Sequence, residues 1–113
     1  MNRKMVAAEL VKIAKMLSGS TGYAWQIDND QINERHHRKG TMGPRGANPE
    51  LVELLRKGEG DKFTMYDDDR IPYYSGRIVG DYDGFEPMDD FGTPDAGCTM
   101  IKYTSGPNRG GFL

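Results

Sequence analysis

Cysteine is nearly absent from this chain, which has Cys98 as its only cysteine among 113 residues. A single thiol excludes an intramolecular disulfide, and it excludes a zinc site built from several cysteines. A reducing cytosol is the natural compartment for such a chain. A lone cysteine beside a strand is typical of a buried, unreactive residue.

Long apolar runs are also missing. The longest helix-like apolar stretch, residues 5–17, is interrupted by Glu9, Lys12 and Lys15. No span of roughly 20 apolar residues is left to cross a membrane. The same charges, with no small-residue cleavage site, argue against a signal peptide. We therefore expect no membrane partner.

The net charge is small, but the charges are unevenly placed. Residues 1–57 carry ten Lys or Arg and six Asp or Glu, whereas residues 58–113 carry five and eleven. The first part is therefore mildly basic, at +4, and the second is acidic, at −6. A +4 segment lies far below the charge density of a dedicated DNA-binding domain. The distribution favours a surface dipole over a nucleic-acid-binding fold.

Residues 4–17 give the clearest helical pattern. Val6, Leu10, Ile13 and Leu17 recur at the spacing that places them on one face of a helix. The pattern indicates a helix packed on the core, and the alternative is a helix that docks on a partner or a membrane surface, although three lysines on its polar face give only weak membrane binding. Tyr23–Ile27 follows as a short strand, because its apolar residues alternate.

A second helix is predicted to begin after Asn48. Asn48 is a favourable N-cap, Pro49 suits the first helical position, and Glu50 complements the helix dipole. Gly58 is placed to end the helix. The apolar face is formed by leucines: Leu51, Leu54 and Leu55.

From residue 62 the pattern changes to the alternation of strands. Strands are predicted over residues 62–66, 71–79 and 99–103, with a bulge at Gly76 and a long connection over residues 85–97. The predicted fold class is α+β, with N-terminal helices followed by a small antiparallel sheet of about three strands. Residues 1–104 form a single domain, with a helical part over 1–58 and a β part over 62–104. Residues 105–113 form a flexible tail unless Phe112 docks.

Three segments of the second part share a recognisable pattern: Asp67–Asp69, then Tyr73-Tyr74-Ser75-Gly76-Arg77, then the acidic-Phe-Gly segment from Asp89 to Cys98. Together they resemble a small uncharacterised module of bacterial and phage-encoded proteins. Arg70 departs from that pattern, which has a glycine soon after the aspartates. The resemblance implies no activity. It implies an accessory protein of phage or mobile-element type in the cytoplasm of a bacterial host.

Five tyrosines mark the candidate interaction surface. Tyrosine is enriched at protein interfaces because it combines a large apolar area with a hydrogen-bonding tip. We therefore expect a protein partner, or a second copy of the chain, to bind there. The candidate residues are Tyr66, Tyr73, Tyr74, Tyr82 and Tyr103.

A basic loop over residues 35–46 gives the alternative function. Cations beside flexible, glycine-rich backbone can hold phosphate groups, so this loop is a candidate site for nucleic acid or another phosphate ligand. It contains no Gly-Lys-Ser/Thr sequence, which excludes a P-loop. The candidate residues are Arg35, His36, His37, Arg38, Lys39 and Arg45.

The acidic turn after the second predicted strand is a candidate calcium site, through Asp81, Asp83 and Glu86. The alternative is that these aspartates form the turn itself. No catalytic residues are predicted, and an enzyme is the least favoured class. His36 or His37 could serve as a base, but neighbouring histidines point in different directions. No cofactor other than calcium is expected.

Overall fold

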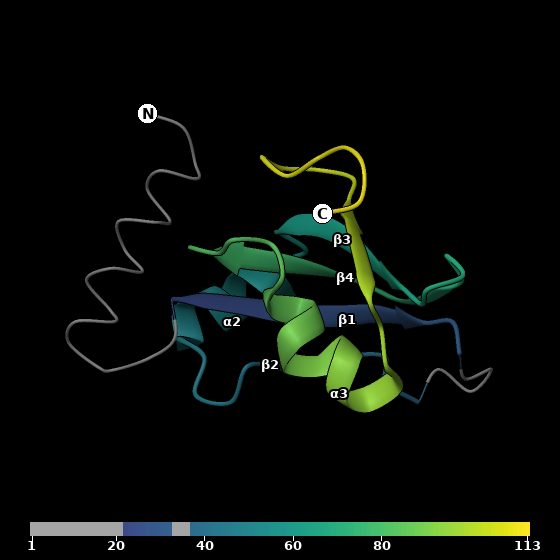
Figure 1. Cartoon of the computed structure of the whole chain (residues 1–113). Coiled ribbons are helices and arrows are strands. Elements are labelled where there is room, and N and C mark those ends of the chain that lie inside the picture. The colour runs from purple at the N-terminus through teal and green to yellow at the C-terminus, as the bar shows by residue number, and fades with distance from the viewer. Residues whose placement is uncertain (1–21, 33–36) are drawn as a thin grey trace.

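The computed structural model describes residues 22–32 and 37–113. In these ranges five strands form one antiparallel sheet, in the order β2-β1-β4-β3-β5 (Figure 1). The strands are β1 (Tyr23–Asp30), β2 (Met42–Gly43), β3 (Asp61–Tyr66), β4 (Pro72–Gly80) and β5 (Met100–Tyr103). The helical elements are α2 (Pro49–Arg56), η1 (Met88–Gly92) and α3 (Thr93–Ala96).

The predicted layout of N-terminal helices followed by a three-stranded sheet is wrong. β1 and β2 both lie in the part predicted to be helical, and β1 is an inner strand of the sheet. It pairs with β4 from Tyr23 opposite Gly80 to Asp30 opposite Tyr74. The strand predicted over Tyr23–Ile27 is confirmed as part of β1, but partners so far apart in the chain leave no local signal of where that strand pairs. The helix predicted over residues 4–17 lies outside the described residues.

Several local predictions are confirmed. The side chain of Asn48 accepts a hydrogen bond from the Glu50 amide at 2.8 Å, and α2 buries Leu51 and Leu55. The three strands predicted in the second part correspond to β3, β4 and β5. The connection predicted over residues 85–97 instead contains the consecutive helical segments η1 and α3.

The bulge predicted at Gly76 is also misplaced. The pairing of β1 with β4 shifts between Ile27 and Asn29, so the extra residue is Asp28 on the facing strand. Gly76 has a different role, because a Cβ there would overlap the carbonyl oxygen of Gln26 and lie 2.9 Å from Cζ of Phe63. Glycine is needed where β1 and the Phe63 ring approach β4 closely.

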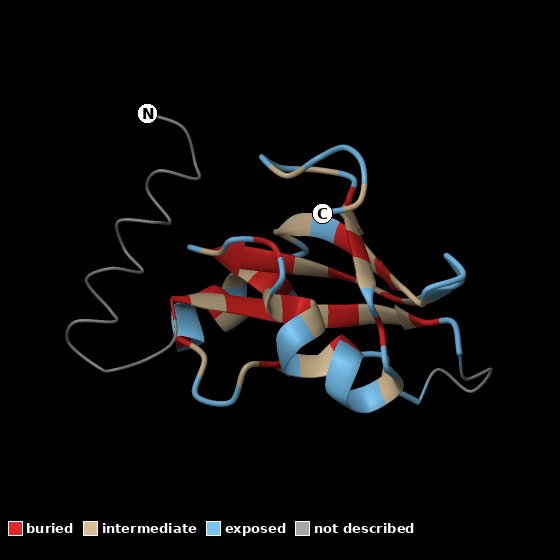
Figure 2. Cartoon of the chain, in the orientation of Figure 1, coloured by how far each residue is buried: buried red, intermediate tan, exposed pale blue. Residues whose placement is uncertain are grey.

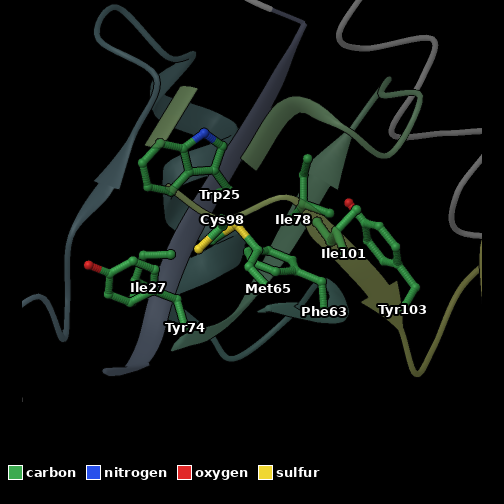
Figure 3. Packing of buried hydrophobic residues seen from close by; sticks show 9 residues of the cluster. All are labelled: Trp25, Ile27, Phe63, Met65, Tyr74, Ile78, Cys98, Ile101 and Tyr103. Carbon is green, nitrogen blue, oxygen red and sulfur yellow. The ribbon is translucent and has the colours of Figure 1, made fainter. Parts of the chain in front are cut away.

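The main core lies on one face of the sheet. η1 and α3 cover this face, whereas α2 lies on the opposite side (Figure 1). Figure 3 shows the cluster with the sulfur atoms of Met65 and Cys98 near its centre. Tyr23 and Trp25 of β1 hold η1 against the sheet, since both donate hydrogen bonds to the Asp90 carboxylate of η1, at 2.8 and 3.0 Å. The buried cluster comprises Trp25, Ile27, Phe63, Met65, Tyr74, Ile78, Cys98, Ile101 and Tyr103.

α2 covers only part of the second face. Leu51 and Leu55 pack on Ala24 of β1 and Val79 of β4. These strand residues belong to the first half of β1 and the last half of β4, which lie at the same end of the sheet. The part of this face built by β3, β5 and the first half of β4 is not packed against α2.

The C-terminal segment lies along the outer edge of β5. Phe112 pairs with Lys102, Arg109 pairs with Tyr103, and the Leu113 amide donates a hydrogen bond to the Ile101 carbonyl at 3.0 Å. The docking of Phe112, on which the predicted mobility of residues 105–113 depended, is thus present. The docked segment pairs with backbone groups of β5 that an added strand would need.

Candidate functional site

The candidate site is the part of the second sheet face that α2 leaves uncovered. Along β3 and β5, buried residues alternate with partly exposed ones (Figure 2). Successive side chains of a strand point to opposite faces, so the partly exposed set shares the face away from the main core. We call this surface the open face, and it consists of Thr64, Tyr66, Ser75, Met100 and Lys102.

Arg77 forms the boundary between the open face and α2. Its guanidinium makes a two-pronged contact with Asp28, at 2.7 and 2.9 Å. The same group donates to the carbonyls of Leu55 and Glu59, at 2.9 and 3.0 Å, which fixes the end of α2 to the sheet. Hydrogen bonding to Asp28 raises the pKa of Arg77. Arg77 therefore holds the edge of the open face in place.

A row of polar side chains crosses the centre of the open face. Lys102 of β5 lies opposite Thr64 of β3, which lies opposite Ser75 of β4. The Thr64 and Ser75 hydroxyls are 3.2 Å apart and hydrogen-bond to each other. Each hydroxyl can also accept a hydrogen bond from a bound molecule, since it has two lone pairs.

A row of larger side chains lies beside the polar row. Met100 pairs with Tyr66, and Tyr66 packs edge-on against Phe112 at a centroid distance of 5.0 Å. Cations of Lys102 and Arg70 lie 5.8 and 5.7 Å from the centre of the Phe112 ring. These contacts hold Phe112 and Tyr66 as an ordered apolar margin along β5.

Tyr73 lies at the tri-aspartate end of the sheet, where it is the extra residue of β4 at a register shift and packs against the main core. The charge of Asp67 raises the pKa of the Tyr73 hydroxyl, and hydrogen bonding to Asp67 adds to the effect. Asp67 also accepts the Asp69 and Ile71 amides, at 2.8 and 2.9 Å, which closes the turn. Arg70 stands there with φ of 63°, the left-handed conformation for which glycine is the usual residue.

The structure separates the five tyrosines that were predicted to form one surface. Tyr66 lies on the open face and Tyr73 packs against the main core, whereas Tyr74 and Tyr103 are only 2% and 1% exposed. Tyr74 donates to Asp95, and Tyr103 donates to the Gly84 carbonyl at 2.9 Å. Tyr82 packs on Tyr103 and donates to Asp61. Tyr74 and Tyr103 therefore stabilise the core and offer no surface to a partner.

Among the described cations of the basic loop, Arg38 is held in an ion pair and the others are exposed. Arg38 pairs with Asp95 at 3.0 Å, and its amide donates to Asp30. His37, Lys39 and Arg45 are exposed. Arg35 and His36 lie outside the described residues. The structure thus uses Arg38 to attach the loop to α3.

The candidate calcium residues form a turn. Both carboxylate oxygens of Glu86 accept backbone amides, from Asp83 and Gly84, each at 2.7 Å. Across residues 22–32 and 37–113, no three His, Cys, Asp or Glu side chains gather in a group that could hold a metal ion. The structure does not bring Asp81, Asp83 and Glu86 together as ligands.

Cys98 is fully buried, as the sequence predicts for a lone cysteine beside a strand. Burial, together with the nearby charges of Asp95 and Asp67, raises its pKa to about 11. The thiol is therefore protonated at neutral pH and is a poor nucleophile. Desolvation likewise raises the pKa of the Tyr74 hydroxyl, which stays protonated beside Asp95.

The sequence reasoning missed four residues of the open face: Thr64, Ser75, Met100 and Lys102. Each alternates with a buried strand residue, and that alternation was the only available signal. Among the described residues, no helix is long and apolar enough to span a membrane. No protein-family model matches the chain, and no curated protein or solved structure matches it. What the chain does must follow from its own residues.

Proposed function

We propose that this chain is a small non-enzymatic accessory protein that binds another protein, or a second copy of itself, through the open face. The observation that carries the proposal is a sheet face that α2 covers only in part and that presents Tyr66 and Met100 partly exposed. Tyrosine supplies contact area at low conformational cost and is enriched at protein interfaces.

The shape of the open face favours a helix as the bound element. α2 rises from the sheet on one side, and the uncovered strands beside it span about 10 Å, since neighbouring strands are ~4.8 Å apart. A helix is also ~10 Å across, so it fits beside α2. Strand addition at β5 is disfavoured because the C-terminal segment already pairs with that edge.

The chemistry of the open face defines the bound helix further. Met100 and the ring of Tyr66 require an apolar stripe. Thr64, Ser75 and Lys102 require polar groups beside that stripe, because a buried polar group without a partner destabilises a complex. Helices that lay one apolar side into such a surface are a common recognition mode.

The biological setting of the proposal rests on the resemblance of the second part to a phage and bacterial module. We accordingly place the protein in the cytoplasm of a bacterial host.

The test compares capture of binding proteins by the native chain and by a Tyr66→Ser/Met100→Ser variant. We expect the variant to retain at least about tenfold less of a specific partner, since tenfold corresponds to ~1.4 kcal/mol and interface tyrosines commonly contribute more. Phe85→Ser is the matched control, because Phe85 is an aromatic residue outside the open face that is 44% exposed.

Circular dichroism and urea unfolding would first establish that all three proteins are folded. Equal capture by the native chain and the double variant would contradict the proposal. Loss of capture after nuclease treatment would contradict it as well, and would transfer the function to nucleic-acid binding by the basic loop.

A further inference from the structure

We infer that the outer edge of β5 is a binding site for an extended segment, and that two copies of this chain exchange residues 109–113 through it. We call residues 109–113 the edge segment. The inference goes beyond the proposed function, because it uses the edge of β5 and does not require the open face. The observations that carry it are the fit of the edge segment to β5, its weak attachment, and a turn that depends on one glycine.

The backbone of the edge segment fits β5 as an added strand would. The Leu113 amide donates a hydrogen bond to the Ile101 carbonyl at 3.0 Å. The Gly110 amide donates one to the Tyr103 carbonyl at 3.2 Å. Both acceptors face away from β3 along the outer edge of the sheet, where an incoming strand binds. The edge of β5 is therefore an occupied strand-binding site.

Two side chains of the edge segment lie on opposite sides of the sheet. Phe112 packs edge-on against Tyr66, on the side of the open face, at a centroid distance of 5.0 Å. A Cβ at Gly84 would lie 2.5 Å from Cδ1 of Leu113. The Gly84 carbonyl also accepts the hydroxyl of Tyr103 from the main core, so the Leu113 side chain lies on the core side. The site thus selects an aromatic residue followed by an aliphatic one, the alternation of a strand.

The edge segment is weakly attached. Its pairing with β5 consists of two isolated bridges, one antiparallel and one parallel. Residues 109–111 are exposed and include Gly110 and Gly111, and glycine loses the most conformational freedom when it is ordered. Leu113 is 43% exposed. Segments with few buried contacts open at a far lower free energy than the core, so the edge segment can leave β5 while the rest of the sheet persists.

Residues 104–108 turn the chain back from β5 to the edge segment, and this turn depends on Gly106. Gly106 has a φ of 82°, in the left-handed region. A Cβ there would lie 2.4 Å from Cγ of Asp61, whose carboxylate accepts a hydrogen bond from the Tyr82 hydroxyl. A β-branched residue fits neither this backbone conformation nor this space. Such a residue at position 106 would therefore open the turn.

The opened turn is long enough to reach a second copy. Residues 104–108 span ~17 Å when extended. If two β5 edges face each other with both edge segments between them, each segment lies two strand spacings, or ~10 Å, from its own β5. A segment tethered by a short linker acts at an effective concentration in the millimolar range. The native chain therefore keeps its own segment at micromolar concentration, and blocking the turn favours exchange.

The first experiment measures binding of a labelled peptide with the sequence of residues 107–113 to the full chain. Phe112→Ser removes the ring from the chain's own segment. Ile32→Ser is the control, because Ile32 is 47% exposed at the end of β1, which two strands separate from β5. We expect Phe112→Ser to bind the peptide at least about tenfold more tightly than the native chain or the control, since its edge is free of competition.

A peptide with serine in place of its phenylalanine should lose this binding. Equal affinity of the native chain and Phe112→Ser would overturn the inference. Absence of peptide binding to Phe112→Ser, or binding that survives loss of the peptide's ring, would overturn it as well.

The second experiment measures mass by light scattering from micromolar to millimolar concentration, for Gly106→Val and Gly111→Val. Gly111→Val is the matched control, because Gly111 is outside the left-handed region and a Cβ there meets nothing within 4 Å. We expect Gly106→Val to dimerise at a concentration at least about tenfold lower than the control. Adding Phe112→Ser to Gly106→Val should abolish the dimer.

Equal dimerisation of the two glycine variants would overturn the inference. A Gly106→Val dimer that survives Phe112→Ser would also overturn it, because the copies would then join through another surface. The peptide experiment leaves the turn unchanged, so it decides the inference even when Gly106→Val does not fold. Neither experiment uses partner capture by the open face, so the inference and the proposed function can fail separately.

Discussion

At the scale of the residue, the most constrained position is Gly76. A Cβ there would meet the Gln26 carbonyl and the Phe63 ring, and backbone cannot move aside as a flexible side chain can. We predict that Gly76→Ala lowers the free energy of unfolding by about 3 kcal/mol, the upper range for overpacking. Gly111→Ala is the control, since a Cβ at Gly111 meets nothing within 4 Å. Urea unfolding measures both, and equal stabilities would refute the close approach of β1 to β4.

At the scale of the element, Arg77 joins β1, β4 and the end of α2. We predict that Arg77→Met lowers the free energy of unfolding by about 3 kcal/mol, because it leaves the Asp28 carboxylate and two carbonyls without their donor. Arg56→Met is the matched control: Arg56 pairs with Glu53 at 3.9 Å with both side chains more than half exposed. Such a pair contributes less than ~1 kcal/mol. A loss in Arg77→Met no larger than in the control would contradict the bridging role.

At the scale of the whole molecule, the core determines the response to alkali. Burial raises the pKa of Cys98 from 9.0 to about 11, and desolvation raises the pKa of Tyr103 as well. Above pH 9 the folded state therefore binds more protons than the unfolded state, so stability falls as pH rises. We predict a urea midpoint that decreases steadily from pH 8 to pH 11. Cys98→Val should make the decline shallower between pH 9 and 11, and a constant midpoint in the native chain would contradict the account.

Whether a part of the fold could be predicted depends on how far apart in the chain its interacting residues lie. Asn48 and Pro49 act within one turn of helix, and the alternation of Phe63 and Met65 acts within one strand, so both could be recognised in the sequence. The pairing of β1 with β4 could not, because it depends on a face shared by strands distant in the chain. Residues 85–97 were predicted as a connection for the same reason: η1 and α3 cover one face of the sheet, and Asp90 is held by Tyr23 and Trp25.

The candidate site was predicted only in part. Tyrosine composition pointed to an interface, and Tyr66 does lie on the open face. The same composition also selected Tyr74 and Tyr103, because a buried tyrosine with a hydrogen-bonded hydroxyl cannot be distinguished by residue type from an exposed one. Thr64 and Ser75 carry no compositional signal at all. Their importance follows from the sheet register, which places their hydroxyls 3.2 Å apart at the centre of the face.

The central claim is that the open face contacts a protein, and site-specific photo-crosslinking in bacterial cells tests it most directly. A benzophenone amino acid would replace Met100 on the open face, Arg45 in the basic loop, or Phe85 elsewhere on the surface. The account predicts a covalent adduct of higher mass from position 100 that resists nuclease, and none from positions 45 or 85. Adducts from position 45 alone, or adducts removed by nuclease, would contradict it.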